Sequence, residues 1–162
     1  MTDGQASVQS SADSPSGIGG WLILPIIGLV VTPLRGVAHL ASYGEILQSM
    51  DRMTGGQASF IVMEVIGNAI LLLVLPIALL VLLFRKSAAF PRWFVIWAAA
   101  GLAFMIADLV IAQVFFGDVL AAAGLSLIDA DTLPELIRGL VLAVIWIPYM
   151  RLSRRVANTF VN

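Results

Sequence analysis

Four long apolar segments restrict this chain to a fold that spans a membrane. They cover about residues 19–43, 60–84, 92–116 and 134–150. Each is close to the ~20 residues that an α-helix needs to cross the hydrocarbon core of a bilayer. The second is the clearest, because residues 69–84 carry no polar side chain, and the fourth is the shortest. We therefore predict an all-α, polytopic transmembrane bundle of four helices.

Composition agrees with a lipid environment and excludes several functions. Of the 162 residues, 60% are hydrophobic and 12% are charged, whereas a soluble domain has about 25% charged residues. A chain this short has too little interior to hide so much apolar surface from water. There is no cysteine, so disulfides and thiolate chemistry are excluded. The net charge of −1 argues against binding to nucleic acid.

The segments outside the spans are short, except at the N-terminus. Residues 1–16 are rich in Ser, Gln and Gly, with no Lys or Arg, and we expect a disordered cytoplasmic tail rather than a signal peptide. Residues 17–162 would form the transmembrane domain. The acidic connection at 117–133 contains an apolar stretch, 119–128, which we interpret as a short interfacial helix. No internal repeat is strong enough to indicate a duplicated half.

The positions of Lys and Arg predict the orientation of the bundle. Six basic residues flank the turn between the second and third spans or follow the fourth span: Arg85, Lys86, Arg92, Arg151, Arg154 and Arg155. With four spans these residues lie on one side, and the opposite side has Arg52 alone. Because cytoplasmic loops carry the excess of basic residues, we expect both termini in the cytoplasm. The same interface would hold the aromatic side chains Trp21, Trp93, Trp97, Trp146 and Tyr149.

Several polar residues fall inside the predicted spans, where a mid-bilayer charge costs about 2.5–3.5 kcal/mol. A helical rise of ~1.5 Å per residue places three charges from three spans at a similar depth: Arg35, Asp108 and Arg138. We predict that they form the centre of a polar cluster in the outer half of the bundle. His39, Glu64 and Asn68 would surround it, and Glu135 lies close to Arg138 on the same helix.

This polar cluster has two interpretations. Its charges could line a binding cavity or ion pathway that is open to the outside. They could instead form a buried ion-pair network that fixes which helices are neighbours. The two differ in solvent access, since a cavity admits water and a closed network does not.

No residue pattern indicates catalysis or a metal site. His39 is the only histidine, and one His does not make a usual zinc site. The sequence has no G-x-S-x-G, no phosphate-binding G-x-x-x-x-G-K-[ST] and no H-E-x-x-H. We therefore expect no cofactor, no metal and no enzymatic activity. Pro25, Pro33, Pro76 and Pro148 would kink their helices.

Both ends of the apolar region carry recognisable sequence. Residues 17–29 read GIGGWLILPIIGL, and residues 153–160 read SRRVANTF after the W-I-P-Y of 146–149. These motifs resemble the bacterial membrane-protein family catalogued as domain of unknown function 2569, over about residues 17–160. The resemblance implies a small multi-pass protein of the bacterial inner membrane and implies no reaction. The motifs would serve topology and anchoring, or would form a cytoplasmic docking site, since both should lie on the same face.

Two functions follow as expectations. The first is a non-enzymatic structural or accessory component of a membrane assembly, in contact with the lipid bilayer and with itself or a larger membrane protein. The second is a small oligomeric transporter or channel whose polar cavity lies in the outer half of the bundle.

Overall fold

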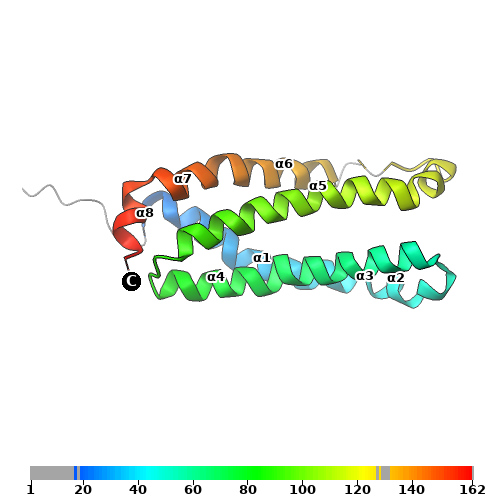
Figure 1. Ribbon diagram of the computed structural model, residues 1–162, viewed down its shortest axis with the longest axis horizontal. Helices are drawn as coiled ribbons and strands as arrows, with labels where there is room; N and C mark the ends of the chain where they lie inside the picture. The colour runs from blue at the N-terminus through cyan, green and yellow to red at the C-terminus, as the bar shows by residue number, and fades with distance from the viewer. Residues whose placement is uncertain (1–16, 18, 127, 129–131, 162) are drawn as a thin grey trace, which may run out of the picture.

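A computed structural model describes residues 17, 19–126, 128 and 132–161 of the chain. The described residues form helices and no strand. Four helical stretches are long and apolar enough to cross a membrane: Gly20–Gln48, Gly55–Phe84, Phe90–Ala122 and Thr132–Leu152. They run alternately up and down the long axis of the molecule (Figure 1). The predicted four-span bundle is confirmed, while the tail predicted at 1–16 lies outside the described residues.

Each span except the third is made of several helical elements. The first contains η1 (Gly20–Leu22), α1 (Ile23–Ser42) and the short α2 (Gly44–Gln48), and the turn η2 (Met50–Arg52) follows it. The second contains α3 (Gly55–Ala69), η3 (Ile70–Val74) and α4 (Leu75–Phe84). The third is the single helix α5 (Phe90–Ala122). The fourth contains α6 (Thr132–Val141), η4 (Leu142–Trp146) and α7 (Ile147–Leu152), and α8 (Arg154–Thr159) follows it.

Helix ends follow local chemistry more closely than hydropathy. Thr54 and Gln57 form a capping box that starts α3 several residues before the apolar run. Helix α5 continues to Ala122 and is followed by Gly124, whose φ of 68° ends the helix. The separate interfacial helix predicted at 119–128 is therefore wrong: its first four residues extend the third span, because no strong helix breaker precedes Gly124.

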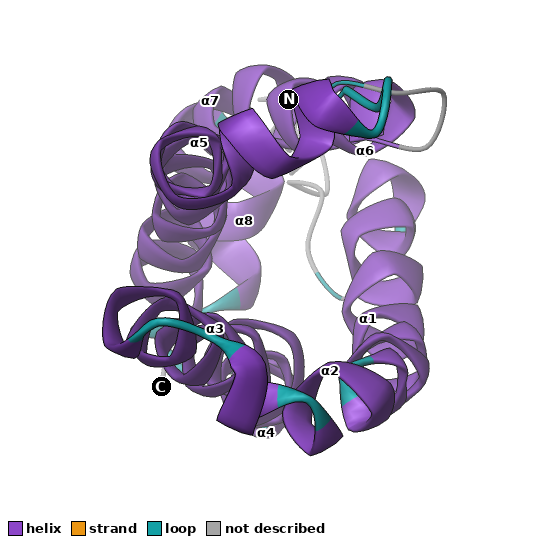
Figure 2. Ribbon diagram, turned by 90° about the vertical axis from the view of Figure 1, so that its right-hand side faces the viewer, coloured by secondary structure: helices purple, strands orange, loops and turns teal. Residues whose placement is uncertain are grey.

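The four spans form a ring in which consecutive spans are neighbours (Figure 2). Helix α1 packs on α4 and η3, α5 packs on α3 and α4, and α5 also packs on α6, η4 and α7. Among the described elements, α1 and α6 have no comparable packing. An ion pair joins these two helices, with 3.4 Å between Arg35 Nη2 and Glu135 Oε1. The ring thus has one weakly packed seam, between the first and fourth spans.

Apolar packing is concentrated at the two ends of the bundle. One buried cluster includes Leu22, Leu83, Phe90, Phe94 and Phe160. The other, toward the opposite end, is formed by Tyr43, Phe60, Ile61 and Ala112. Many remaining Leu, Ile and Val side chains point outward, as expected for helices that contact lipid tails. The middle of the bundle is left for polar side chains.

The two ends of the described chain pack against each other. Thr159 Oγ1 donates to the backbone oxygen of Gly17 over 3.3 Å. The Arg155 guanidinium lies over Gly19 and Gly20, so close that a Cβ atom at either position would be 3.0–3.1 Å from it. Gly20 also has a φ of 57°, which favours glycine. The G-I-G-G-W and S-R-R-V-x-x-T-F segments are thus partners in one contact.

The second and fourth spans share a local arrangement. Each contains a five-residue π-helical segment, η3 or η4, followed one residue later by proline: Pro76 or Pro148. The two prolines are 148 − 76 = 72 residues apart, as are the starts of the segments, 142 − 70 = 72. Helix α1 packs on η3 as α5 packs on η4. The structure thus relates the first helix pair to the second, a correspondence that the sequence alone did not reveal.

Candidate functional site: a polar cavity within the bundle

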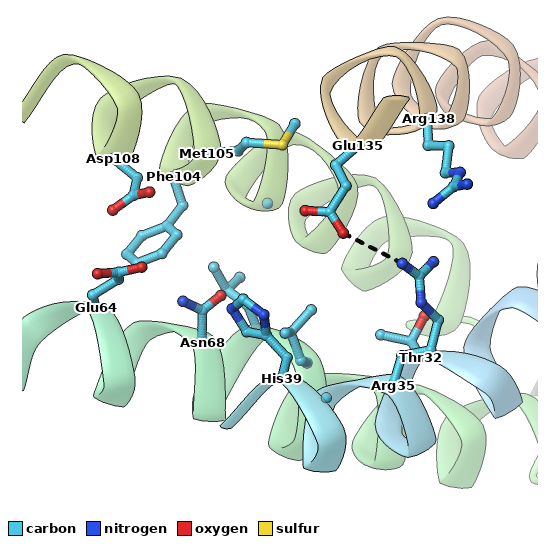
Figure 3. A pocket seen from close by; sticks show the side chains of 14 residues that line it. Thr32, Arg35, His39, Glu64, Asn68, Phe104, Met105, Asp108, Glu135 and Arg138 are labelled. Atoms are coloured by element: carbon cyan, nitrogen blue, oxygen red, sulfur yellow. Dashed lines mark hydrogen bonds and ion pairs between the residues drawn. The ribbon is translucent and has the colours of Figure 1, made fainter. Parts of the chain in front are cut away.

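A cavity of about 310 Å³ lies between the four spans (Figure 3). Its lining includes all six residues of the predicted polar cluster: Arg35, His39, Glu64, Asn68, Asp108 and Arg138. Thr32 and Glu135 contribute further polar groups, and Leu71, Leu72, Phe104 and Met105 contribute apolar ones. A volume of this size is at the lower end of the range for small-molecule sites.

One end of the cavity holds two carboxyl groups. Asp108 on α5 and Glu64 on α3 face each other across it (Figure 3). The Tyr43 hydroxyl donates to Glu64 Oε1 and lies 3.5 Å from His39 Nε2. Asp108 Oδ1 is buried and has no hydrogen-bond partner among the described residues. A buried polar atom without a partner costs free energy, so the Asp108 carboxylate, which lines the cavity, lacks a donor that the described residues could supply.

The other end of the cavity holds two arginines. Arg35 on α1 pairs with Glu135 on α6, and both side chains are more than half exposed, at 58% and 55%. Arg138 points into the same region (Figure 3). It makes no hydrogen bond or ion pair with another described residue. A guanidinium without a partner within a membrane-spanning bundle is a functional candidate.

The internal arrangement of the cluster differs from the predicted one. Arg35, Asp108 and Arg138 were expected at one level, but the Tyr43–Glu64 contact sets a different register. Tyr43 follows Arg35 by eight residues, which corresponds to about 12 Å of helical rise. Phe104 of α5 lies against Gly67 of α3, so Asp108, one turn further on, is near the level of Glu64. Depth counted from assumed helix starts could not show this offset.

Ion pairing also differs from expectation. Glu135 was expected to pair with Arg138, three residues away on the same helix. It forms its ion pair with Arg35 of another span instead. No ion pair joins Asp108 to either arginine among the described residues. The cavity is therefore polarised, with Glu64 and Asp108 at one end and the arginines at the other.

A second cavity, of about 480 Å³, continues from the carboxylate end. The two cavities share Glu64, Met105, Asp108 and Glu135. The second is lined mainly by apolar side chains and reaches Met53 beside η2, Val119 near the end of α5, and Thr132 at the start of α6. The shared residues place the second cavity beside the first, on the side toward the end of the bundle that carries Arg52.

The residues predicted at the cytoplasmic interface are of two kinds, basic and aromatic. The six basic residues at the ends of α4, α5, α7 and α8 lie at one end of the bundle, and Arg52 in η2 lies at the other. Trp21 and Trp93 are exposed there. Trp97 is not an interface residue: its ring is buried, and its Nε1 donates to Leu71 O over 2.8 Å. Trp146 and Tyr149 pack edge to face.

Tyr43 and Thr32 also belong to the site, although neither was among the predicted residues. Tyr43 follows His39 by one helical turn, so a shared helix face could have indicated it. Thr32 precedes Arg35 by three residues and gave no charge signal. Among the described residues, no three His, Cys, Asp or Glu side chains are grouped as a metal ion would require.

Comparisons with known proteins give one match. A family model described as a protein of unknown function (DUF2569) matches residues 15–161. No curated protein matches the chain, and no solved structure does so either. The matched region contains both end segments, the four spans and every residue of the cavity. The chain therefore belongs to the DUF2569 family of proteins of unknown function.

Proposed function

We propose that this multi-pass membrane protein is a small non-enzymatic transporter subunit that binds a polar solute in the cavity at the centre of its bundle. The observation that carries the proposal is that two charged residues of the cavity, Asp108 and Arg138, form no ion pair with another described residue. A buried ion-pair network would join Asp108 to Arg35 or Arg138, whereas the structure separates them. Asp108 and Arg138 both line the cavity, and Asp108 Oδ1 has no hydrogen-bond partner among the described residues.

The relation between the two helix pairs supports this reading. Transporters built from repeats hold their substrate at the interface between the repeats, near the middle of the bilayer. Here the cavity lies between the first pair of spans and the second. Each pair also contains a π-helical segment followed by proline, and such irregular turns are frequent at functional sites. These turns would let one pair move relative to the other.

The basic residues at the two ends of the bundle indicate from which side of the membrane a solute would enter the cavity. Six basic residues at one end against Arg52 at the other favour both termini in the cytoplasm of a bacterial inner membrane. The second cavity then opens toward the outside. One chain of 17.3 kDa with four spans is too small to enclose a complete path across the membrane, so several copies would form the path together.

Cysteine labelling tests the proposal directly, because the chain has no native cysteine. Gly101 lines the cavity, and a Cβ there meets no atom within 4 Å. Gly28 is equally open but does not line the cavity. In intact cells, a membrane-impermeant thiol reagent should label Gly101→Cys and leave Gly28→Cys unlabelled. Protection of both positions would contradict an aqueous route.

A second candidate is the structural component of a larger membrane assembly. The Arg35–Glu135 ion pair favours it, because this pair joins the first and fourth spans where little other packing exists. Under this reading the cavity stays closed to water and Gly101→Cys is protected. Crosslinking in native membranes would then identify the partner, either a second copy of this chain or a larger membrane protein.

A further inference from the structure

We infer that the ligand of the cavity is a small zwitterion, with its anionic group at the arginines and its ammonium group at the carboxylates. This inference rests on the proposed binding function and adds the chemical class of the solute. It follows from which groups in the cavity already have partners and which do not.

The carboxylate end needs a hydrogen-bond donor. Glu64 already accepts from the Tyr43 hydroxyl, but Asp108 Oδ1 is buried without a partner. Neither arginine supplies the missing donor: Arg35 pairs with Glu135, and Arg138 lies at the other end of the cavity (Figure 3). A primary ammonium group donates three hydrogen bonds and carries the charge that a carboxylate requires.

The arginine end needs an acceptor. Glu135 Oε1 contacts only Nη2 of the Arg35 guanidinium, at a long distance of 3.4 Å. Arg138 has no partner among the described residues. A guanidinium presents a fork of N–H donors that fits a carboxylate with two parallel bonds. A ligand carboxylate between Arg35 and Arg138 would satisfy the free donors of both.

A simple ion would satisfy only one end. An anion at Arg138 leaves Asp108 without a donor, and a cation at Asp108 leaves the arginine without an acceptor. An unpaired charge is costly in a membrane-spanning bundle, so a ligand that carries both charges gains at both ends. Asn68 and His39 lie between the ends (Figure 3) and can bond polar groups in the middle of such a molecule. The 310 Å³ volume has the space of about ten waters.

The test compares three straight-chain probes of equal carbon number: ω-aminohexanoate, hexanoate and hexylammonium. Affinities are measured by isothermal titration calorimetry on the full chain in lipid nanodiscs. We expect ω-aminohexanoate to bind at least about tenfold more tightly than either singly charged probe, about 1.4 kcal/mol in binding free energy. Shorter and longer ω-amino acids then locate the preferred charge separation.

Two substitutions assign the ends independently. Asp108→Asn should lower the affinity for ω-aminohexanoate to that for hexanoate, while hexanoate binding stays unchanged. Arg138→Gln should lower it to that for hexylammonium, with hexylammonium unaffected. Arg52→Gln, which removes a cation outside both cavities, is the matched control and should change nothing. Size-exclusion profiles confirm that each variant is folded. If one variant fails to fold, the other still tests which ligand group binds at its own end of the cavity.

The outcomes separate this inference from the proposed function. Equal affinity for hexanoate and ω-aminohexanoate overturns the zwitterion and identifies an anion site. Equal affinity for hexylammonium and ω-aminohexanoate overturns it in favour of a cation site. If no ω-amino acid binds while Gly101→Cys is labelled from outside, the ligand class is wrong and the open cavity stands. If Gly101→Cys is protected, the binding function itself fails.

Discussion

Trp97 shows how one side chain compensates for an irregular backbone. In a π-helix each N–H bonds to the carbonyl five residues earlier, so residue 76 would serve Leu71. That residue is Pro76 and has no N–H. The indole Nε1 of Trp97 donates to Leu71 O instead, over 2.8 Å. The Leu71 carbonyl thus keeps a hydrogen bond that its own helix cannot provide.

Replacing Trp97 by Phe should therefore destabilise the bundle. The loss of one buried hydrogen bond costs about 1 kcal/mol, and the smaller ring adds a packing term. Trp93→Phe is the control, because Trp93 is about half exposed and makes no such bond. The free energy of unfolding, measured by equilibrium denaturation in mixed micelles, should fall for the first variant only. Equal losses would mean that the Leu71 contact contributes nothing.

At Gly36 the first span approaches the second closely. A Cβ there would lie 2.8 Å from Leu72 Cβ and 3.2 Å from the backbone oxygen of Leu72. Backbone atoms cannot swing aside, so Gly36→Ala must push α1 away from η3. We expect a loss of about 1–3 kcal/mol in the free energy of unfolding, as for other overpacked sites.

Gly28 supplies the matched comparison on the same helix. A Cβ at Gly28 meets nothing within 4 Å, so Gly28→Ala should be neutral or stabilise by up to about 1 kcal/mol through helix propensity. The same denaturation measurement applies to both variants. A Gly36→Ala protein as stable as the parent would show that α1 is free to shift without cost.

Among the helical elements, the π-helical segments η3 and η4 are those that hydropathy could not predict. Hydropathy placed all four spans because a bilayer demands about 20 apolar residues whatever their helical geometry. It could not place η3 or η4, since a π-turn changes backbone register without changing composition. The offset between Arg35 and Asp108 escaped prediction for a related reason: the relative depth of two helices depends on contacts such as Tyr43–Glu64.

Restoring the missing N–H groups tests whether the π-helical segments depend on their prolines. Pro76→Ala supplies a donor to the second span, so we expect amide hydrogen exchange to slow across Ile70–Val74. Pro148→Ala should do the same for Leu142–Trp146. Each variant is the control for the other, because the segment that keeps its proline should exchange as before. Slowing in neither segment would show that packing alone imposes the π-turns.

For the molecule as a whole, sequence predicted the number of spans and which polar residues would gather, but not their pairing. Polarity identified six of the residues that line the cavity, because a polar side chain in a span has few other places to point. Which carboxylate meets which arginine depends on ring order and helix register. Glu135 consequently pairs with Arg35 across the seam rather than with its neighbour Arg138. The contact between Gly20 and the Arg155 guanidinium likewise could not be predicted, because it depends on how the two ends of the chain pack against each other.

The orientation of the whole bundle gives a further prediction. Gly17 and Thr159 are in contact, so both ends of the described chain lie on one side, and the six basic residues lie there too. Green fluorescent protein fused after Asn162 should therefore fluoresce, which it does when folded in the cytoplasm. Alkaline phosphatase inserted after Arg52 should be active, which requires the opposite side. Phosphatase activity from a C-terminal fusion would reverse the assignment.

The ion pair across the seam also sets an order of events during synthesis. Arg35 and Glu135 are 100 residues apart in the chain, and translation adds about 5–20 residues per second. Arg35 is thus made roughly 5–20 s before the carboxylate that it pairs with. During that interval the first three spans must hold an unmatched guanidinium among themselves or beside the insertion machinery. The last span to arrive neutralises it, so neutralisation of Arg35 reports that the ring has closed.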